Sequence, residues 1–179
     1  MPRLRARIVL ACAVYVAALV AANLLVARFG PAATPVIGFF LIGLDLTLRD
    51  TLHDAWAGRG LWPRMLVLIG SAGALSWALD PASGRIALAS LIAFVAAALA
   101  DALVYQALRR SSRFGSWLMR ANGSNAAGAA VDSLLFPLLA FGALMPSISA
   151  AQFGAKLAGG FLWSLLLRAR AGAQQQPLR

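Results

Sequence analysis

The chain has 179 residues, of which 61% are hydrophobic, and its mean hydropathy is +0.78. A soluble domain of this length does not carry so much apolar surface, so the composition indicates an integral membrane protein that contacts the lipid bilayer. The formal net charge of +10 would suit a nucleic-acid binder, but the cations lie in short clusters between apolar runs. Such clusters are typical of cytoplasmic loops, and we therefore expect no nucleic-acid partner.

Six apolar runs follow one another along the chain. They cover residues 8–26, 34–48, 65–79, 86–108, 125–145 and 150–167. A helix of roughly 20 apolar residues crosses the hydrocarbon core of a membrane. Breaks are expected at Gly30-Pro31, Pro63, Asp80-Pro81 and Met145-Pro146, because proline cannot donate a helical hydrogen bond. The sequence predicts an all-α bundle of six transmembrane helices over residues 1–170 and a disordered cytoplasmic tail over residues 171–179.

The arginines indicate how this bundle is oriented. With six spans, one side of the membrane holds only Arg28 and Arg85. The other side holds thirteen: Arg3, Arg5, Arg7, Arg49, Arg59, Arg64, Arg109, Arg110, Arg113, Arg120, Arg168, Arg170 and Arg179. Arginine and lysine accumulate in cytoplasmic loops, so both termini are expected in the cytoplasm. This pattern predicts a multi-pass protein of the cytoplasmic (inner) membrane.

Small residues recur at helical spacing in three of the runs. They are Ala13, Ala17 and Ala21 in the first, Ala89, Ala93, Ala97 and Ala100 in the fourth, and Gly154, Ala158 and Gly159 in the last. Such faces let helix backbones approach closely in lipid. One interpretation is packing within the bundle, and the other is docking to a partner membrane subunit.

Four ionisable residues lie within the predicted spans: Asp45, Asp101, Asp132 and Lys156. A charge near the bilayer centre costs at least about 2.5 kcal/mol, so such a side chain usually faces a partner or a wet cavity. Lys156 paired with Asp132 or Asp101 would hold the bundle together without further function. The alternative interpretation is a binding site inside the bundle.

Helical spacing groups other polar and aromatic residues with these charges. Tyr105 lies one turn from Asp101, and Asn125, Asp132 and Phe136 share one stripe. Counted from the helix ends at about 1.5 Å per residue, the two aspartates are expected in one layer.

Two further groups follow from the same spacing. Lys156 shares a helix face with Gln152, and Asn23 is expected near its level. Asp45, Arg49 and His53 form a stripe that would carry the second span into the cytoplasm as one helix.

Catalytic chemistry has few candidate residues in this chain. His53 is the only histidine and Cys12 the only cysteine. No histidine cluster, multi-thiolate metal site, glycine-rich phosphate loop or Ser/His/Asp set can be assembled. We expect no enzyme activity, no metal and no cofactor.

Three segments, taken together with the order of the spans, resemble a known family. They are Asp45 to Arg49, Ala100 to Tyr105, and Ser124-Asn125 followed by Val131 to Phe136. This set is similar to the queuosine-precursor transporters, also called the vitamin uptake transporter or YhhQ-like family. Asn23 and Lys156 also match positions of that family.

The resemblance implies import of a 7-deazaguanine, such as 7-cyano-7-deazaguanine, for queuosine synthesis on tRNA. It implies a substrate site formed by Asn23, Asp45, Arg49, Asp101, Tyr105, Asn125, Asp132, Phe136 and Lys156. In that site Asp101 and Asp132 would read the donor edge of the base or shuttle protons. Lys156 and Asn23 would face an acceptor, and Phe136 or Trp163 would stack on the ring.

Two other functions remain open at this stage. The family also resembles the substrate-binding subunits of energy-coupling-factor importers, which need an ATPase module; the first span would then be the docking surface. A structural or regulatory membrane protein without transport is the other. Association into a homo-oligomer is also open.

Overall fold

The computed structural model describes residues 2–56, 60–110 and 117–173, and the regular structure in these residues is entirely helical. α1 covers Pro2–Phe29. A continuous helical column follows, made of η1 (Pro31–Ala33), α2 (Thr34–Ile37), η2 (Gly38–Ile42) and α3 (Gly43–Ala55). The remaining elements are α4 (Leu61–Leu79), η3 (Pro81–Ser83), α5 (Gly84–Arg110), α6 (Trp117–Phe141) and α7 (Pro146–Ala173). The all-α prediction is confirmed.

Glycines with positive φ set several of the helix ends. Gly30 (φ 72°) follows α1, Gly60 (φ 90°) precedes α4, and Gly142 (φ 77°) follows α6. A residue without Cβ adopts this conformation at little cost, and it turns the chain out of the helix. The fifth apolar run was predicted to reach residue 145, but the helix ends at Phe141 because of Gly142.

The expected breaks and the expected tail shift by small amounts. Pro63 lies in the first turn of α4 rather than before it, where no helical hydrogen bond is lost. α7 continues to Ala173, past the predicted start of the tail at residue 171, and residues 174–179 lie outside the described part of the chain.

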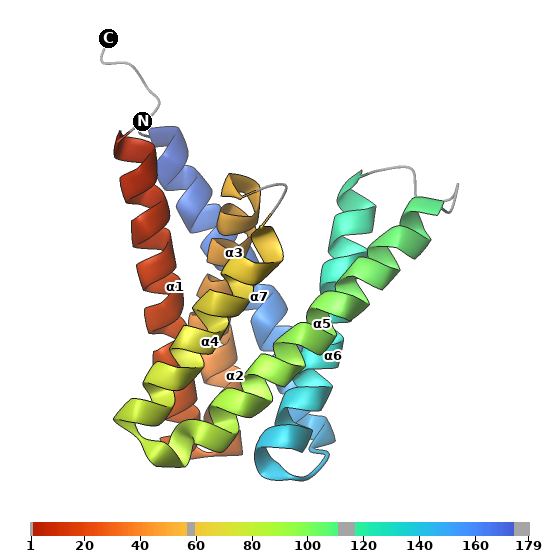
Figure 1. Ribbon diagram of the computed structural model, residues 1–179. Helices are drawn as coiled ribbons and strands as arrows, with labels where there is room; N and C mark the ends of the chain where they lie inside the picture. The colour runs from red at the N-terminus through yellow and green to blue at the C-terminus, as the bar shows by residue number, and fades with distance from the viewer. Residues whose placement is uncertain (1, 57–59, 111–116, 174–179) are drawn as a thin grey trace.

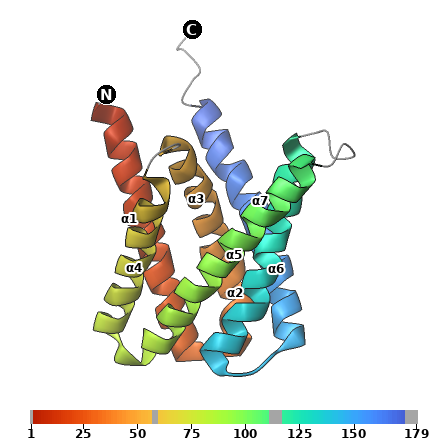
Figure 2. The ribbon, with the colours of Figure 1, turned by 45° about the vertical axis from the view of Figure 1, so that its right-hand side comes forward.

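The long helices alternate in direction and close into a ring. α1 packs on α3 and α4, α3 on α7, α7 on α6, α6 on α5, and α5 on α4. The start of α1 and the end of α7 lie at the same end of the bundle (Figures 1 and 2). Among the described arginines, Arg28 and Arg85 lie at the opposite end, near the end of α1 and the start of α5.

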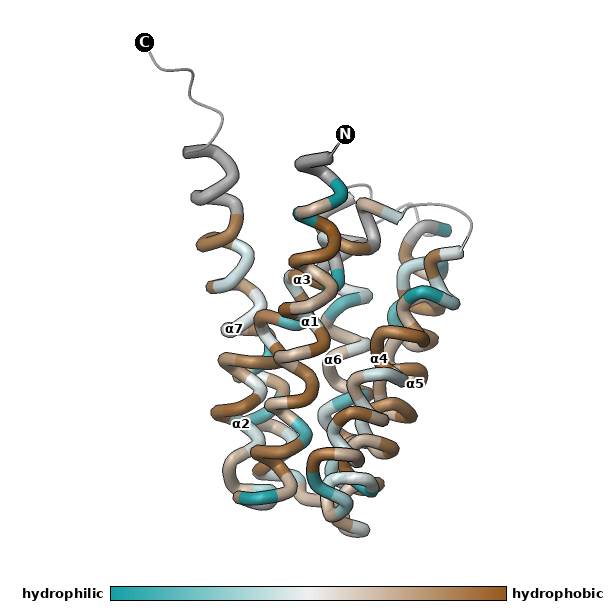
Figure 3. The backbone as a smooth tube through the Cα atoms, turned by 60° about the vertical axis from the view of Figure 1, so that its left-hand side comes forward, coloured by the Kyte–Doolittle hydropathy of each residue, from teal (hydrophilic) through white to brown (hydrophobic). Residues whose placement is uncertain are grey.

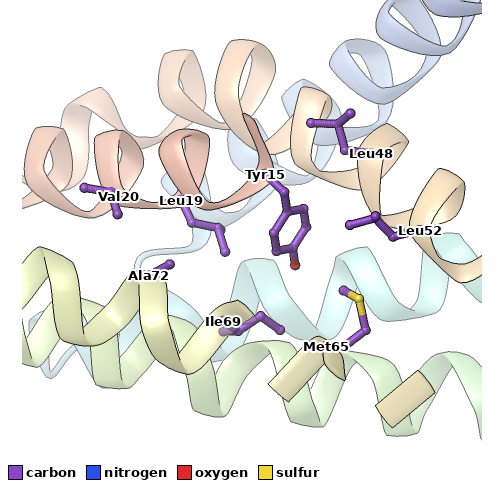
Figure 4. Close-up of a cluster of buried hydrophobic side chains, with 8 residues drawn as sticks. All are labelled: Tyr15, Leu19, Val20, Leu48, Leu52, Met65, Ile69 and Ala72. Carbon is purple, nitrogen blue, oxygen red and sulfur yellow. The ribbon is translucent and has the colours of Figure 1, made fainter. Parts of the chain in front are cut away.

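Two apolar clusters hold the ring together. The larger joins α1, α3 and α4 through Tyr15, Leu19, Val20, Leu48, Leu52, Met65, Ile69 and Ala72 (Figure 4). The smaller lies around Ala22, Val26, Ile37, Ile86, Ala89 and Ala140, where α1, α2, α5 and α6 meet. Polar side chains near the second cluster are therefore surrounded by apolar packing.

The outer surface of the bundle is also apolar. Val9, Val67, Leu103 and Phe161 are each exposed over about two thirds of their surface. Figure 3 shows hydrophobic residues along the helices, with only a few hydrophilic positions within their length. In the described residues, four stretches are long and apolar enough to cross a bilayer: Arg5–Phe29, Pro31–Arg49, Pro81–Leu108 and Gly123–Phe141. A surface of this kind is suited to lipid, so the chain is a multi-pass membrane protein.

The small-residue faces have different roles. Ala89, Ala93 and Ala97 are buried, and Ala97 contacts the position of Gly128 on α6, so the α5 face serves packing within the bundle. Gly159 of α7 also packs internally, because a methyl group there would overlap the carbonyl of Phe39. The α1 face differs, since the side chains of Ala13 and Ala17 are exposed.

Candidate functional site

A buried ion pair joins α6 and α7. Lys156 Nζ lies 2.5 Å from Asp132 Oδ2 and donates a second hydrogen bond, 3.3 Å long, to Ser133 Oγ. The Lys156 side chain is 5% exposed and that of Asp132 is 24% exposed. The interpretation that these two residues form an ion pair is therefore confirmed. Asp132 also keeps contact with open space, which a purely structural pair does not need.

That open space is a small cavity inside the ring. Its lining comes from α1, α2, η2, α5, α6 and α7, and it consists of Ala22, Asn23, Val26, Thr34, Ile37, Gly38, Ile42, Ser90, Asp132, Phe136, Gln152 and Lys156. Its volume is about 50 Å³. Of the nine residues in the predicted site, four line this cavity together: Asn23, Asp132, Phe136 and Lys156. Residues from four helices, α1, α2, α6 and α7, thus bring polar side chains together around this cavity.

Asn23 is fixed by a helix that does not itself line the cavity. Its Nδ2 donates to Ser76 Oγ of α4 over 3.1 Å, and both residues are buried. Ser76 Oγ in turn donates to the carbonyl of Ala72 over 2.7 Å. The hydroxyl proton is therefore used within α4, and Ser76 can only accept from Asn23.

Gln152 is held in the same manner on the other side of the cavity. Its Nε2 donates to Thr34 Oγ1 over 2.8 Å, and Thr34 Oγ1 donates to the carbonyl of Pro31 over 2.7 Å. Both side chains are buried. The sequence indicated that Gln152 shares a face with Lys156, but it gave no reason to select Thr34, which is one of many hydroxyl residues in the runs.

A π-helical segment forms part of the cavity wall. In η2 the N–H of Gly43 bonds to the carbonyl of Gly38, which inserts an extra residue into the helical turn. Gly38 and Ile42 of this segment line the cavity. Phe40 within it accepts a 2.9 Å hydrogen bond from Trp163 Nε1. The Trp163 side chain is therefore bound to η2 and is not among the lining residues. No feature of the sequence predicted the π segment.

Asp45 and Arg49 of α3 belong to a different cluster. The Asp45 side chain is buried and interacts with Tyr15 of α1. Arg49 lies close enough to Tyr15 for an electrostatic interaction with it. The Arg49 guanidinium also lies 5.7 Å from the centre of the Phe94 ring on α5, a cation–π distance. These residues are in one helix, as predicted, but they lie outside the lining of the cavity. The side chain of His53 is not among those described.

Asp101, Tyr105 and Asn125 also lie outside the lining. The Cβ of Asp101 is next to Gly128, one turn before Asp132 on α6. Asp101 Oδ1 is buried and has no hydrogen-bond partner among the described residues. Tyr105 is half-buried, and Asn125 is exposed. Asp101 and Asp132 thus occupy neighbouring turns at the α5–α6 contact, and only Asp132 reaches the cavity.

The described residues contain no group of three or more histidine, cysteine or acidic side chains that could hold a metal ion. The chemistry available in the cavity is therefore hydrogen bonding, charge pairing and contact with one aromatic ring, Phe136. These are the elements of a binding site for a small polar molecule.

The comparison with protein families gives one match. A family model described as "Putative vitamin uptake transporter" matches residues 5–168, which is almost the whole chain. No curated protein and no solved structure matches the chain.

Proposed function

The chain belongs to the vitamin uptake transporter family, and from this membership we propose that it imports a queuosine precursor across the cytoplasmic membrane. The proposed substrate is 7-cyano-7-deazaguanine or a related 7-deazaguanine. Membership in a transporter family agrees with the expectation that the chain is not an enzyme. The substrate rests on the resemblance described above and on the chemistry of the cavity.

The observation that carries the proposal is the cavity around the Lys156–Asp132 pair. A guanine-like base has a flat ring, an edge of N–H donors and a carbonyl acceptor. The cavity offers a carboxylate and two side-chain amides for the polar edges and Phe136 for the ring. Polar groups inside a membrane are expensive and therefore usually mark a transport pathway. Packing alone would not require several of them to line one space.

The size of the cavity indicates that binding includes a conformational change. Pockets for ligands of this kind measure about 300–1,000 Å³. The cavity of about 50 Å³ is much smaller and lies between the helices. Helices of the ring must therefore separate to admit a bicyclic base, as alternating access requires. Binding of the substrate and opening of the cavity would then involve the same residues.

The topology that we propose has six spans with both termini in the cytoplasm. Its support is the antiparallel order of the long helices (Figure 1) and the position of Arg28 and Arg85 near the end of α1 and the start of α5. α4 and α7 do not meet the criteria of length, hydropathy and charge that the four candidate spans meet, but they complete the ring between the others.

A second candidate function is that of a substrate-binding subunit in an energy-coupling-factor type importer. The exposed side chains of Ala13 and Ala17 on α1 favour it, because small residues on an outer face let another helix approach closely. An ATPase module that co-purifies with the chain would support this candidate. Uptake by the chain alone in liposomes would support an autonomous carrier.

The test of the proposed function uses a host that cannot make the precursor. The cells receive 7-cyano-7-deazaguanine at low concentration, and the queuosine content of their tRNA is measured with and without this gene. We expect queuosine only when the gene is present. Equal queuosine content in both strains, with the protein verified in the membrane, would contradict the proposal.

A further inference from the structure

We propose that Ser76 and Thr34 are positioning residues that fix the amide oxygens of Asn23 and Gln152 toward the cavity, so that the site selects ligands by their N–H donors. This inference rests on the proposed function only for the ring system of the ligand. Its content is the specificity of the site: a ligand edge with an amino group next to a ring N–H should bind, and the same edge without the amino group should bind poorly.

The hydroxyl groups of Ser76 and Thr34 both donate to carbonyls of their own helical segments. Ser76 Oγ donates to the Ala72 carbonyl over 2.7 Å, and Thr34 Oγ1 donates to the Pro31 carbonyl over 2.7 Å. A hydroxyl has one proton, so each of these groups can only accept a further hydrogen bond. Asn23 and Gln152 must therefore turn their NH₂ groups toward them, as the 3.1 and 2.8 Å contacts show.

The carbonyl oxygen of each amide is left for a ligand. An amide side chain has a donor end and an acceptor end, so fixing the NH₂ group fixes the carbonyl oxygen as well. No hydrogen bond in the described part of the chain uses Asn23 Oδ1 or Gln152 Oε1. Both residues line the cavity. Ser76 of α4 thus orients the amide of Asn23 on α1, and Thr34 of α2 orients the amide of Gln152 on α7. In both cases the carbonyl oxygen is left for a ligand.

The charges of Asp132 and Lys156 also determine which ligands fit the cavity. Asp132 uses Oδ2 for Lys156, and its other oxygen, Oδ1, accepts no hydrogen bond from the described residues. Lys156 directs two of its three N–H bonds to Asp132 and Ser133. The cavity therefore has a surplus of acceptors but no surplus of negative charge. Neutral N–H donors fit such a site better than a metal cation, which Lys156 would repel.

The experiment measures ligand preference in the full-length protein, purified in lipid nanodiscs. Binding is determined by calorimetry for two matched pairs: 7-deazaguanine against 7-deazahypoxanthine, and 2-aminopyrimidin-4-one against pyrimidin-4-one. In each pair only the amino group differs. We expect the wild type to prefer the amino compound about tenfold, the difference that a hydrogen bond to a neutral acceptor makes.

The variants S76A and T34V remove the anchors and let the amides rotate, so the preference should fall to about threefold or less. S76T and T34S keep the hydroxyl and should keep the preference. The matched control is S71A, because Ser71 is also on α4 and bonds to the Leu68 carbonyl, but it is exposed and does not line the cavity. If S76A does not fold, T34V and T34S carry the test alone, because Thr34 anchors the second amide in the same manner.

The outcomes separate this inference from the proposed function. The inference is supported if the wild type prefers the amino compound in any ring system that binds, and if S76A and T34V lose this preference. If that result occurs for the pyrimidine pair alone, the inference holds and the proposed substrate fails. If 7-deazaguanine binds but the preference is unchanged in S76A and T34V, the inference fails and the proposed substrate stands. Binding of none of the four compounds, or stabilisation by sodium ions in their place, would overturn both.

Discussion

The Lys156–Asp132 pair allows a prediction in which stability and transport respond differently. The change Asp132→Asn leaves the Lys156 ammonium with a neutral amide oxygen and with Ser133 at 3.3 Å. The Lys156 side chain is only 5% exposed, so water does not compensate for the lost charge of the Asp132 carboxylate. Breaking a buried pair in this way costs about 3–5 kcal/mol. At about 2–4 °C per kcal/mol for a chain of this length, the unfolding midpoint should fall by about 10 °C.

The reverse change, Lys156→Met, should cost less. It leaves the Asp132 carboxylate without its partner, but this side chain is 24% exposed toward the cavity and remains partly hydrated. We expect a loss of about 1–3 kcal/mol, the usual cost of one polar group without its partner. The double variant Asp132→Asn with Lys156→Met has no charge to compensate. Its stability should return to within about 1 kcal/mol of the wild type, since replacing both members of a buried pair is often neutral.

The assay combines unfolding in detergent, followed by intrinsic fluorescence, with precursor uptake at matched protein levels. Asp80→Asn is the control, because Asp80 accepts only a local hydrogen bond from Ala82 N at the start of η3. We expect the double variant to recover abundance but not uptake. Full uptake by the double variant would show that the pair is a structural clamp and not part of the substrate site. An Asp132→Asn protein as stable as the wild type would refute the assignment of a buried, uncompensated charge.

Three further predictions follow from other parts of the bundle. Gly159→Ala should destabilise the protein by about 1–3 kcal/mol, because the added methyl group overlaps the Phe39 carbonyl, whereas Gly154→Ala, with open space around it, should have no effect on the unfolding midpoint. Asp101→Asn should leave stability unchanged or raise it, since it removes a carboxylate whose Oδ1 has no partner in the described residues, and it should lower uptake if the group carries protons. Reporter fusions should place the end of α5 in the cytoplasm and the turn between α6 and α7 outside, and the same side for both would exclude six spans.

The sequence was sufficient for the helices because lipid restricts the alternatives. Long apolar runs cannot form exposed sheet edges in a membrane, and proline and glycine mark where they end. The errors were small and local, as at Gly142, where a positive φ ends α6 before the apolar run is over. The π segment was not predictable, because Gly38 to Ile42 has the same apolar composition as an ordinary helical turn.

For the site, the sequence indicated candidate residues because charged residues are rare within the predicted spans. It could not show which of these residues lie close together in the bundle. Lys156 and Asp132 meet because few other charges are available within the spans. Spacing along one helix gives the depth and the face of a residue, but not which helix lies opposite that face. Asp45 therefore seemed equivalent to Asp132, although it interacts with Tyr15 and not with the cavity. Anchors such as Ser76 are even harder to predict, since hydroxyls are common and this one acts on a residue 53 positions away.

The contacts around the cavity also indicate which helices can move to widen it. The column of η2 and α3 is joined to α7 at the level of the backbone, because Gly43 and Gly159 leave no space for a side chain between them. The hydrogen bond from Trp163 Nε1 to the Phe40 carbonyl reinforces this contact. Two helices in contact through their backbones cannot separate without losing all of these interactions together.

The hairpin of α5 and α6 is attached to the rest of the ring in a different way. The two helices pack on each other more extensively than any other pair, with Gly128 against Ala97 and Asp101. Toward α7, the described polar contacts of the hairpin are those of Lys156 with Asp132 and Ser133. The hairpin also packs on α4 and α1, so we expect loss of the ion pair to release its α7 side first. A ligand that competes for Asp132 would act on the contact that opens its own cavity.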